Sequence, residues 1–305
     1  DMMNIQFLRH VTTASELEPH LVPLAYLKAG KSVGKIAFGE YSSPNFLTRE
    51  HYIPATATKT EKPNQQSNEQ LLVEMFIPVG KQPAGGWPVA IFGHGFQDSV
   101  YGVPWIMAPA LASAGVATLA INCVGHGGGS EGKVVVTTAD NSTVTFNAGG
   151  RGMDMNQDGL IDKTEGATAA APYEIVGLRD SVRQNAVDMM QLVQQIRSGI
   201  DVDADGRIAF DANRVYYAGI SLGAICGTLI MGIEPTVRVG VLNVPGGSLI
   251  NTARLGLYRY TLGQILRARE PSILNLAQNS NSTTLAEFEE NIPLRNVAIV
   301  INNVA

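Results

Sequence analysis

The feature that most constrains this chain is a serine set between two glycines, Gly219-Ile220-Ser221-Leu222-Gly223. A β-branched and aromatic run typical of a strand precedes it at residues 214–218, and a run of small and apolar residues typical of a helix follows it. A serine on a sharp strand-to-helix turn needs small residues two positions before and after it, because the two backbones pass close together there. The pattern therefore predicts a turn that presents Ser221 as a nucleophile.

A second short motif lies upstream, where the apolar run at 89–92 opens into Gly93-His94-Gly95-Phe96. We expect a strand followed by a loop in which the backbone N–H of Phe96, together with that of Leu222, faces the oxygen of a tetrahedral intermediate. Preorganised donors of this kind are each worth roughly two to three powers of ten in rate. His94 is expected to shape this loop rather than to act as a general base. The alternative interpretation is an ordinary turn at the end of a strand.

Between these motifs the chain alternates between strand-like and helix-like segments. Strands are expected at 33–41, 71–78, 88–93, 116–122, 214–220 and 237–244, and helices at about 14–28, 104–114 and 176–198. In the last helix the apolar residues recur at helical spacing and predict one buried stripe. They are Val182, Ala186, Met189, Val193 and Ile196. Strands that alternate with helices predict an α/β fold with a mostly parallel, doubly wound sheet.

Combined with the serine turn, this order predicts an α/β-hydrolase with cap inserts. We expect an N-terminal segment at 1–70, with a polar surface loop near 56–68, and a hydrolase core at 71–305 that is incomplete at its C-terminus. Inserts are expected at about 127–175 and 248–295, after strands whose carboxyl ends form the ligand-binding crevice of such folds. The second insert alternates leucine, isoleucine and tyrosine with arginine. It predicts either an apolar cap suited to an acyl group or a helix pair packed on the core.

Composition excludes several classes of protein. Among 305 residues, 45% are hydrophobic and 16% are charged, which is enough for one large core. The net charge of −5 argues against nucleic acid as a partner, and no apolar run is long enough for a transmembrane segment. The two cysteines, Cys123 and Cys226, are too few for a disulfide framework. Each is expected to pack as a small hydrophobic residue.

The first insert contains an acidic loop of twelve residues, at 154–165. Calcium binds six to eight oxygen atoms, and such a loop supplies them from positions 1, 3, 5, 7, 9 and 12, with glycine at position 6. The predicted ligands are Asp154, Asn156, Asp158, the carbonyl of Leu160, Asp162 and Glu165, with Gly159 at the turn. The glycine-rich residues before the loop do not form an entering helix, so we expect an isolated structural calcium site. An acidic turn without a metal is the alternative.

A second acidic loop begins at Asp201 and resembles the first less closely. Its predicted ligands are Asp201, Asp203, Asp205, the carbonyl of Arg207 and Asp211. Ala212 stands where the bidentate glutamate belongs, so Asp211 would have to replace it from one position earlier. This loop connects the helix at 176–198 to the strand that leads to Ser221. We therefore expect it at the opposite end of the sheet from the serine, where it would hold a connection.

Together these segments resemble a known family. The runs Gly85-Gly86-Trp87-Pro88-Val89-Ala90-Ile91-Phe92 with His94-Gly95, Leu178 to Gln184, the Asp-x-Asp-x-Asp-Gly loop and Arg214 to Gly223 are similar to extracellular lipases of Gram-negative bacteria, the lysophospholipase and virulence-factor lipase group. The resemblance covers roughly 85 to 245. It implies carboxyl-ester hydrolysis, a longer chain, and secretion, periplasmic location or display at the bacterial cell surface. Ile220 and Phe96 depart from the residues usual in that group, which keeps aryl-ester and polyester substrates open.

The histidines limit this interpretation. All five precede Ser221: His10, His20, His51, His94 and His126. In α/β-hydrolases the order is nucleophile, acid and then histidine, so we expect the acid and the base beyond Ala305. His126, in a Gly-His-Gly turn, is the alternative base.

The sequence therefore predicts a serine esterase or lipase, stabilised by calcium, that forms an acyl-enzyme on Ser221. Its substrate would be a small-molecule or lipid ester, with contact to lipid surfaces left open. A hydrolase-fold protein that only binds is the competing class.

Overall fold

The computed structural model describes residues 5–11, 20–21, 24–58, 61–171, 173–246, 256 and 258–268. The chain divides into two compact units, residues 1–245 and 246–305. The boundary expected near residue 70 would instead separate two strands that pair along their whole length, from Val33 with Pro78 to Asn45 with Ser67. The first 70 residues therefore belong to the same unit as the core.

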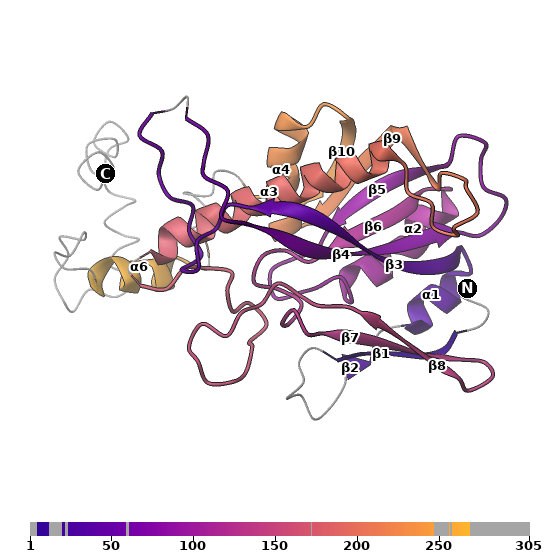
Figure 1. Ribbon diagram of the computed structural model, residues 1–305, viewed down its shortest axis with the longest axis horizontal. Coiled ribbons are helices and arrows are strands. Elements are labelled where there is room, and N and C mark those ends of the chain that lie inside the picture. Colours follow the sequence, from indigo (N-terminus) through magenta and orange to yellow (C-terminus); the bar gives the residue numbers. More distant parts are fainter. Residues whose placement is uncertain are drawn as a thin grey trace. The chain divides into compact units, whose positions relative to one another are not determined.

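The first unit is built on a six-stranded sheet with the order β10-β9-β5-β6-β4-β3 (Figure 1). Its strands are β3 (Val33–Asn45), β4 (Ser67–Pro78), β5 (Trp87–Gly93), β6 (Ala117–Ile121), β9 (Phe210–Ile220) and β10 (Val237–Asn243). The four strands from β10 to β6 are parallel, whereas β4 pairs antiparallel with both β6 and β3. Strand β5 pairs with β9, although more than a hundred residues separate them in the sequence.

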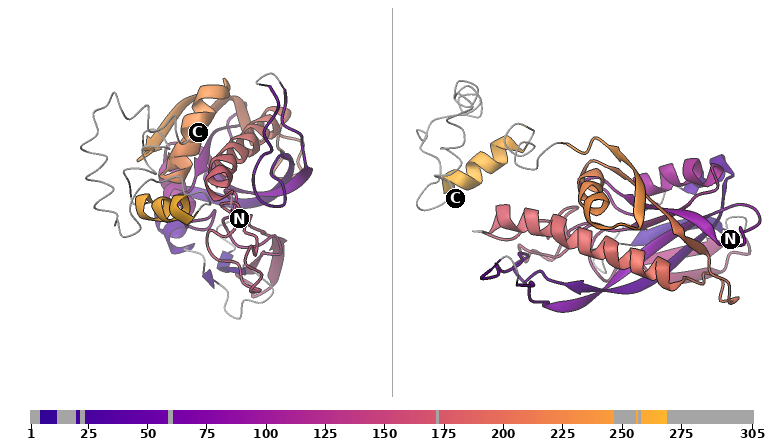
Figure 2. Two further views of the ribbon diagram at one scale, coloured as in Figure 1. Left: turned by 90° about the vertical axis from the view of Figure 1, so that its left-hand side faces the viewer. Right: turned by 90° about the horizontal axis from the view of Figure 1, so that it is seen from above.

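Helices cover both faces of this sheet. On one face lie α3 (Glu174–Ser198) and α4 (Leu222–Ile233), side by side (Figure 2). The five residues of the predicted stripe on α3 are all buried in one cluster with β-strand residues such as Val89 and Leu119. On the other face, α1 (Leu24–Gly30) and α2 (Val103–Ser113) pack around Phe76 and Trp105. Because successive strand residues point to opposite faces, β3, β4 and β6 contribute residues to both clusters.

The first insert differs from its predicted role as a cap over the site. Its first part forms the hairpin of β7 (Lys133–Thr138) and β8 (Thr143–Asn147), in which β7 pairs with the N-terminal strand β1 (Ile5–Val11). With β2 (His20–Leu21) they make a second, four-stranded sheet with the order β2-β1-β7-β8. Val134 and Val136 are buried with Leu8 in the cluster of α1 and α2. The hairpin thus extends the core on that face, because its apolar residues and those of β1 bury one another.

Two further predictions differ from the structure or fall outside it. The described part of the helix expected at 14–28 is β2 and the start of α1, which begins only at Leu24. Of the second insert the structure describes Gly256 and residues 258–268, with the helix α6 (Arg259–Ala268); the rest of 248–295 lies outside the described residues. None of the described helices combines the length and apolar character needed to cross a membrane.

Candidate active site

Ser221 occupies the turn between β9 and α4, as predicted. Its φ angle is 51°, in the left-handed region that a residue with a side chain rarely adopts. Such strain persists only where the surroundings impose it. Here the N–H of Ser221 donates to the carbonyl of Asn243, at 3.0 Å, and a methyl group placed on Gly219 would lie 2.8 Å from the carbonyl of Gly223. The two glycines therefore have the close backbone contact that this turn requires.

A buried tyrosine stabilises the turn through a hydrogen bond to its backbone. Tyr217 is 1% exposed, and its hydroxyl donates to the carbonyl of Gly223 at 2.5 Å. Burial raises the pKa of Tyr217 well above its usual value, so the hydroxyl remains a donor at neutral pH. This hydrogen bond joins the strand before Ser221 to the first turn of the helix after it.

The loop after β5 is fixed against the same helix by His94. The N–H of Gly223 donates to the carbonyl of His94 at 2.9 Å. The imidazole is fully buried: Nδ1 lies 2.8 Å from the carbonyl of Gly95, and Nε2 accepts the N–H of Cys123 at 2.9 Å. Burial lowers the pKa of His94 to about 4, so the neutral ring carries its proton on Nδ1. Both ring nitrogens are thus used by the backbone, which fits the loop-shaping role expected for His94.

The predicted oxyanion donors flank Ser221. Gly95 lies beside the serine, since a methyl group on it would be 3.7 Å from Cβ of Ser221, and Phe96 is the next residue. Leu222 is the first residue of α4. The first N–H groups of a helix have no acceptor within the helix and point out of its N-terminus, where they favour a developing negative charge. The two N–H groups therefore come from segments that meet at the nucleophile.

His126 lies behind this loop. Its ring centroid is 5.3 Å from those of both Phe96 and His94. Nδ1 lies 2.8 Å from the carbonyl of Val124, which makes Nδ1 the donor, while the buried Nε2 has no hydrogen-bond partner among the described residues. Burial, reinforced by His94, lowers the pKa of His126 to about 4. The ring is therefore neutral at pH 7, with an unused acceptor.

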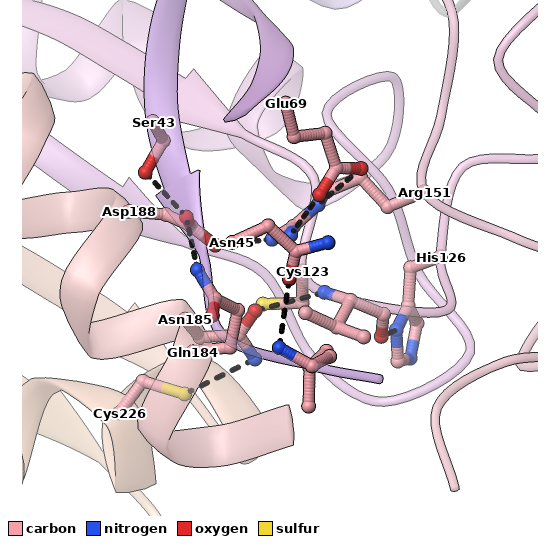
Figure 3. A network of polar contacts seen from close by, with 12 residues as sticks. Ser43, Asn45, Glu69, Cys123, His126, Arg151, Gln184, Asn185, Asp188 and Cys226 are labelled. Atoms are coloured by element: carbon pink, nitrogen blue, oxygen red, sulfur yellow. Dashed lines mark hydrogen bonds and ion pairs between the residues drawn. The ribbon is translucent and has the colours of Figure 1, made fainter. Parts of the chain in front are cut away.

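A buried ion network that the sequence did not predict holds the first insert to the core (Figure 3). The guanidinium of Arg151 pairs with Asp188 of α3 and, at 2.9 Å, with Glu69 of β4. Burial by itself lowers the pKa of Arg151, but the two carboxylates outweigh it and raise that pKa. Asp188 also accepts the hydroxyl of Ser43 at 2.7 Å. Arg151 stands in a glycine run, where no local pattern marks it as a buried residue.

The two acidic loops fold alike. In the loop at 154–165, Asp154 accepts the N–H groups of Asp158 and Gly159 at 3.2 and 2.9 Å. In the second loop, Asp201 accepts those of Asp205 and Gly206 at 3.2 and 2.8 Å. Across the described residues, no three histidine, cysteine, aspartate or glutamate side chains converge as they would around a bound metal ion. Their carboxylates instead hold the N–H groups of their own loops.

The loops differ in their charged neighbours. In the second loop, Lys35 pairs with Asp203, Arg207 pairs with Asp205 at 2.5 Å, and Arg214 pairs with Asp211 at 2.6 Å. Within the described residues, the carboxylates of the loop at 154–165 make no ion pair. Its Glu165 instead accepts the N–H groups of Met155 and Asn156 through Oε1, and that of Asp162 through Oε2. The first loop therefore keeps its negative charge, while the second is largely neutralised.

Comparison with known proteins finds similarity to solved structures at low sequence identity. No family model matches the chain, and no curated protein matches it. Among solved structures, it is similar to an acetyl xylan esterase from Paenibacillus sp. R4, with 15% identity over 92% of this chain and 71% of the other, at a TM-score of 0.39. Acetyl xylan esterase 1 from Thermoanaerobacterium sp. JW/SL YS485 has 15% identity over 86% and 69% of the two chains, at a TM-score of 0.44. A cold-adapted esterase from an Arctic intertidal metagenomic library has 14% identity over 78% and 70%, at a TM-score of 0.37.

Structural similarity this distant does not identify a substrate. The strand order and the serine turn between β9 and α4 define the fold themselves, and the chain has an α/β-hydrolase fold.

Proposed function

We propose that the chain is a serine carboxyl-ester hydrolase that works through an acyl-enzyme on Ser221. One observation carries the proposal: Ser221 is held at a φ angle of 51° between β9 and α4, with the backbone of Gly95 beside it. A strained serine at the carboxyl end of a parallel strand, next to a loop and a helix N-terminus, is the arrangement by which the α/β-hydrolase fold presents a nucleophile and oxyanion donors to an ester.

The chemistry follows from this geometry. The hydroxyl oxygen of Ser221 attacks the ester carbonyl carbon, and the carbonyl oxygen becomes an oxyanion that accepts the N–H groups of Phe96 and Leu222. Collapse of this intermediate expels the alcohol and leaves the acyl group on Ser221, and water then releases the acid. The hydroxyl proton must pass to a general base as the bond forms. His94 does not supply that base, because the backbone occupies both of its ring nitrogens.

A fluorophosphonate probe tests the proposal, because it labels only an activated serine. Wild-type protein should be labelled at Ser221 and should hydrolyse short and medium p-nitrophenyl esters. Ser221→Ala should lose both properties with little change in melting temperature, since the substitution deletes one hydroxyl. Ser113→Ala, at the exposed end of α2, is the matched control and should behave like the wild type. Wild-type-like turnover in Ser221→Ala would refute the assignment, and an unlabelled wild-type protein would favour the binding-only alternative.

We further propose that the loop at 154–165 binds a structural calcium ion. Carboxylate, amide and carbonyl oxygens suit this hard cation, and the loop's uncompensated negative charge supports the assignment. Asp154, Asn156, Asp158, Asp162 and Glu165 would supply side-chain oxygens, and Leu160 a carbonyl. The ion would hold the two ends of the loop together. The second loop is the weaker candidate, because a cation there would have to displace Lys35 and Arg207.

The natural substrate and location are also proposals. We propose a small-molecule or lipid ester as substrate and a secreted, periplasmic or surface-exposed protein. The one described helix of the second insert supports lipid contact, because Tyr260 in α6 is 60% exposed. Co-sedimentation of the full chain with phospholipid vesicles tests this contact, and a protein that stays in the supernatant would refute it.

A further inference from the structure

The residues that flank the loop at 154–165 and the oxyanion loop at 94–96 contact one common segment, Gly125-His126. The N–H of Gly125 donates to the carbonyl of Arg151 at 2.9 Å, and the N–H of Arg151 donates to the carbonyl of His126 at 2.7 Å. The pairing continues where the N–H of Gly152 donates to the carbonyl of Gly128, at 2.7 Å. The residues just before the acidic loop are therefore held backbone to backbone against the segment that carries His126.

The other end of the acidic loop packs against the same segment. The N–H of Met153 donates to the carbonyl of Glu165 at 3.1 Å, which closes the base of the loop. Directly after Glu165, the backbone of Gly166 and Ala167 lies against Gly125: a methyl group there would be 2.6 Å from the carbonyl carbon of Gly166. The residues directly after the loop are therefore in close backbone contact with Gly125.

Arg151 holds the residues before the acidic loop in place, so that a movement of the loop falls on the residues after it. Its guanidinium is buried and fixed to Asp188 of α3 and Glu69 of β4 (Figure 3). Breaking a buried ion pair is strongly unfavourable, so the start of the loop stays with the core. We therefore expect a displacement of the loop to move Gly166 and Ala167, whose backbone contacts Gly125.

From His126 the contact continues to the oxyanion loop. The ring lies edge-on to Phe96, with centroids 5.3 Å apart at an interplanar angle of 73°, and equally near His94. His94 and Phe96 are the two neighbours of Gly95, which lies beside Ser221. Because Nε2 of His126 has no hydrogen-bond partner among the described residues, the hydrogen bond to Val124 and packing alone set the position of the ring.

We propose that His126 is a positioning residue that couples the conformation of the loop at 154–165 to the oxyanion donors beside Ser221. The inference rests on the proposed esterase function and deepens it: an intact acidic loop sets the reactivity of Ser221 as well as the stability of the fold. Misplacement of a reacting group by about 1 Å costs on the order of a hundredfold in rate. A partial shift of the Phe96 N–H therefore predicts a loss of about tenfold or more.

The experiment measures the second-order rate at which a fluorophosphonate labels Ser221 in the full chain. Asp154→Asn removes one charge from the acidic loop and should slow labelling at least about tenfold. The matched control is Asp140→Asn, the same substitution in the same insert, at an exposed turn where Asp140 accepts the N–H of Ser142. It should stay within about twofold of the wild type. In the wild type, chelation of calcium should slow labelling as Asp154→Asn does. Ester turnover, expressed per folded protein, should lose kcat with KM nearly unchanged.

A double-mutant cycle assigns the effect to His126. His126→Phe keeps an aromatic ring against Phe96 but loses the hydrogen bond to Val124, so labelling should slow and become insensitive to Asp154→Asn. Rate losses that multiply in the double variant, or equal effects of Asp154→Asn and Asp140→Asn, would overturn the proposal. Complete loss of labelling in His126→Phe alone would make His126 the general base and would also overturn it.

A separate measurement covers failure of the esterase proposal itself. If wild-type Ser221 is not labelled, the proposed function fails, and coupling is then measured from the ring-nitrogen NMR signals of His126. Asp154→Asn should shift those signals, while Asp140→Asn should leave them in place. Unshifted signals in a folded Asp154→Asn protein would overturn the coupling. If Asp154→Asn does not fold, the chelator titration of the wild-type protein, read by the same signals, decides.

Discussion

A buried carboxyl group on β4 gives the chain a pH dependence that a single substitution should remove. Glu74 has no exposed surface; its Oε2 accepts the indole N–H of Trp105 at 2.9 Å, and its Oε1 has no partner among the described residues. Burial raises its pKa well above the usual 4.5. The perturbation is Glu74→Gln, which keeps the shape and the acceptor for Trp105 but cannot ionise.

The direction and size of this pH dependence follow from the linkage between proton binding and folding. The folded chain keeps the proton of Glu74 above pH 4.5, while the unfolded chain releases it, so folding stability falls as pH rises toward the folded-state pKa. Each pH unit between the unfolded-state and folded-state pKa values costs at most about 1.4 kcal/mol. The variant lacks this dependence. Its stability relative to the wild type should therefore improve, by up to about 1.4 kcal/mol for each pH unit, as the pH rises from 5 to 7.

The stability of the variant must be compared with that of the wild type at each pH, because the protonation of two histidines changes folding stability in the opposite direction. His94 and His126 have folded pKa values of about 4, below the value of about 6.5 in the unfolded chain. Their contribution is present above pH 6.5 and is lost as pH falls toward 4, by about 2 kcal/mol each between pH 7 and 5. These contributions oppose that of Glu74 in the wild type but are common to both proteins. Urea unfolding of both proteins at pH 5, 6 and 7 measures the difference, and a difference that does not change with pH would refute a neutral buried Glu74.

Three further outcomes are expected. Tyr217→Phe removes the hydrogen bond to Gly223 and should lower the free energy of unfolding in urea by about 1 kcal/mol. It should also slow the labelling of Ser221. An unchanged free energy of unfolding and labelling rate would refute the supporting role of Tyr217. Gly93→Ala places a methyl group 2.8 Å from Cα of Gly223 and should destabilise by about 1–3 kcal/mol in the same assay. Chelation should lower the melting temperature, because a metal at a hundred to a thousand times its dissociation constant adds roughly 3–4 kcal/mol. Glu165→Gln should reproduce part of that loss, and a melting curve unaffected by chelator would count against a calcium site.

The sequence predicted those parts of the fold that local periodicity encodes. The stripe from Val182 to Ile196 is buried as expected, because a helix against a sheet must bury one face. The strand boundaries around Ser221 were predicted because glycine spacing and the change from β-branched to small residues mark the turn directly. Those signals lie within about fifteen residues of the serine, so they need no knowledge of the rest of the chain.

The sequence did not predict the contacts that depend on distant partners. The hairpin β7–β8 has the alternation of a strand pair, but only β1, more than a hundred residues earlier, decides where it packs. Arg151 looked like part of a glycine-rich loop, and its burial depends on Glu69 and Asp188 arriving from two other elements. The position of His126 behind Phe96 is of the same kind. Local propensity cannot specify such pairings, because their energy arises only once the sheet has formed.

The two acidic loops show how far a motif can be interpreted without its neighbours. By spacing they differ at ligand positions 9 and 12, where the second loop has Ala209 and Ala212, and by backbone hydrogen bonds they are nearly the same. Lys35, 168 residues from its partner Asp203, changes the electrostatics of the second loop, and Arg207 and Arg214 do the same from within it. A divalent ion there must replace ion pairs that already offset the charge, whereas at 154–165 it meets carboxylates with no such competitor among the described residues. Since attraction for a cation grows with uncompensated charge, Asp154→Asn should weaken calcium binding more than Asp201→Asn does, and calorimetric titration that ranked them the other way would contradict this argument.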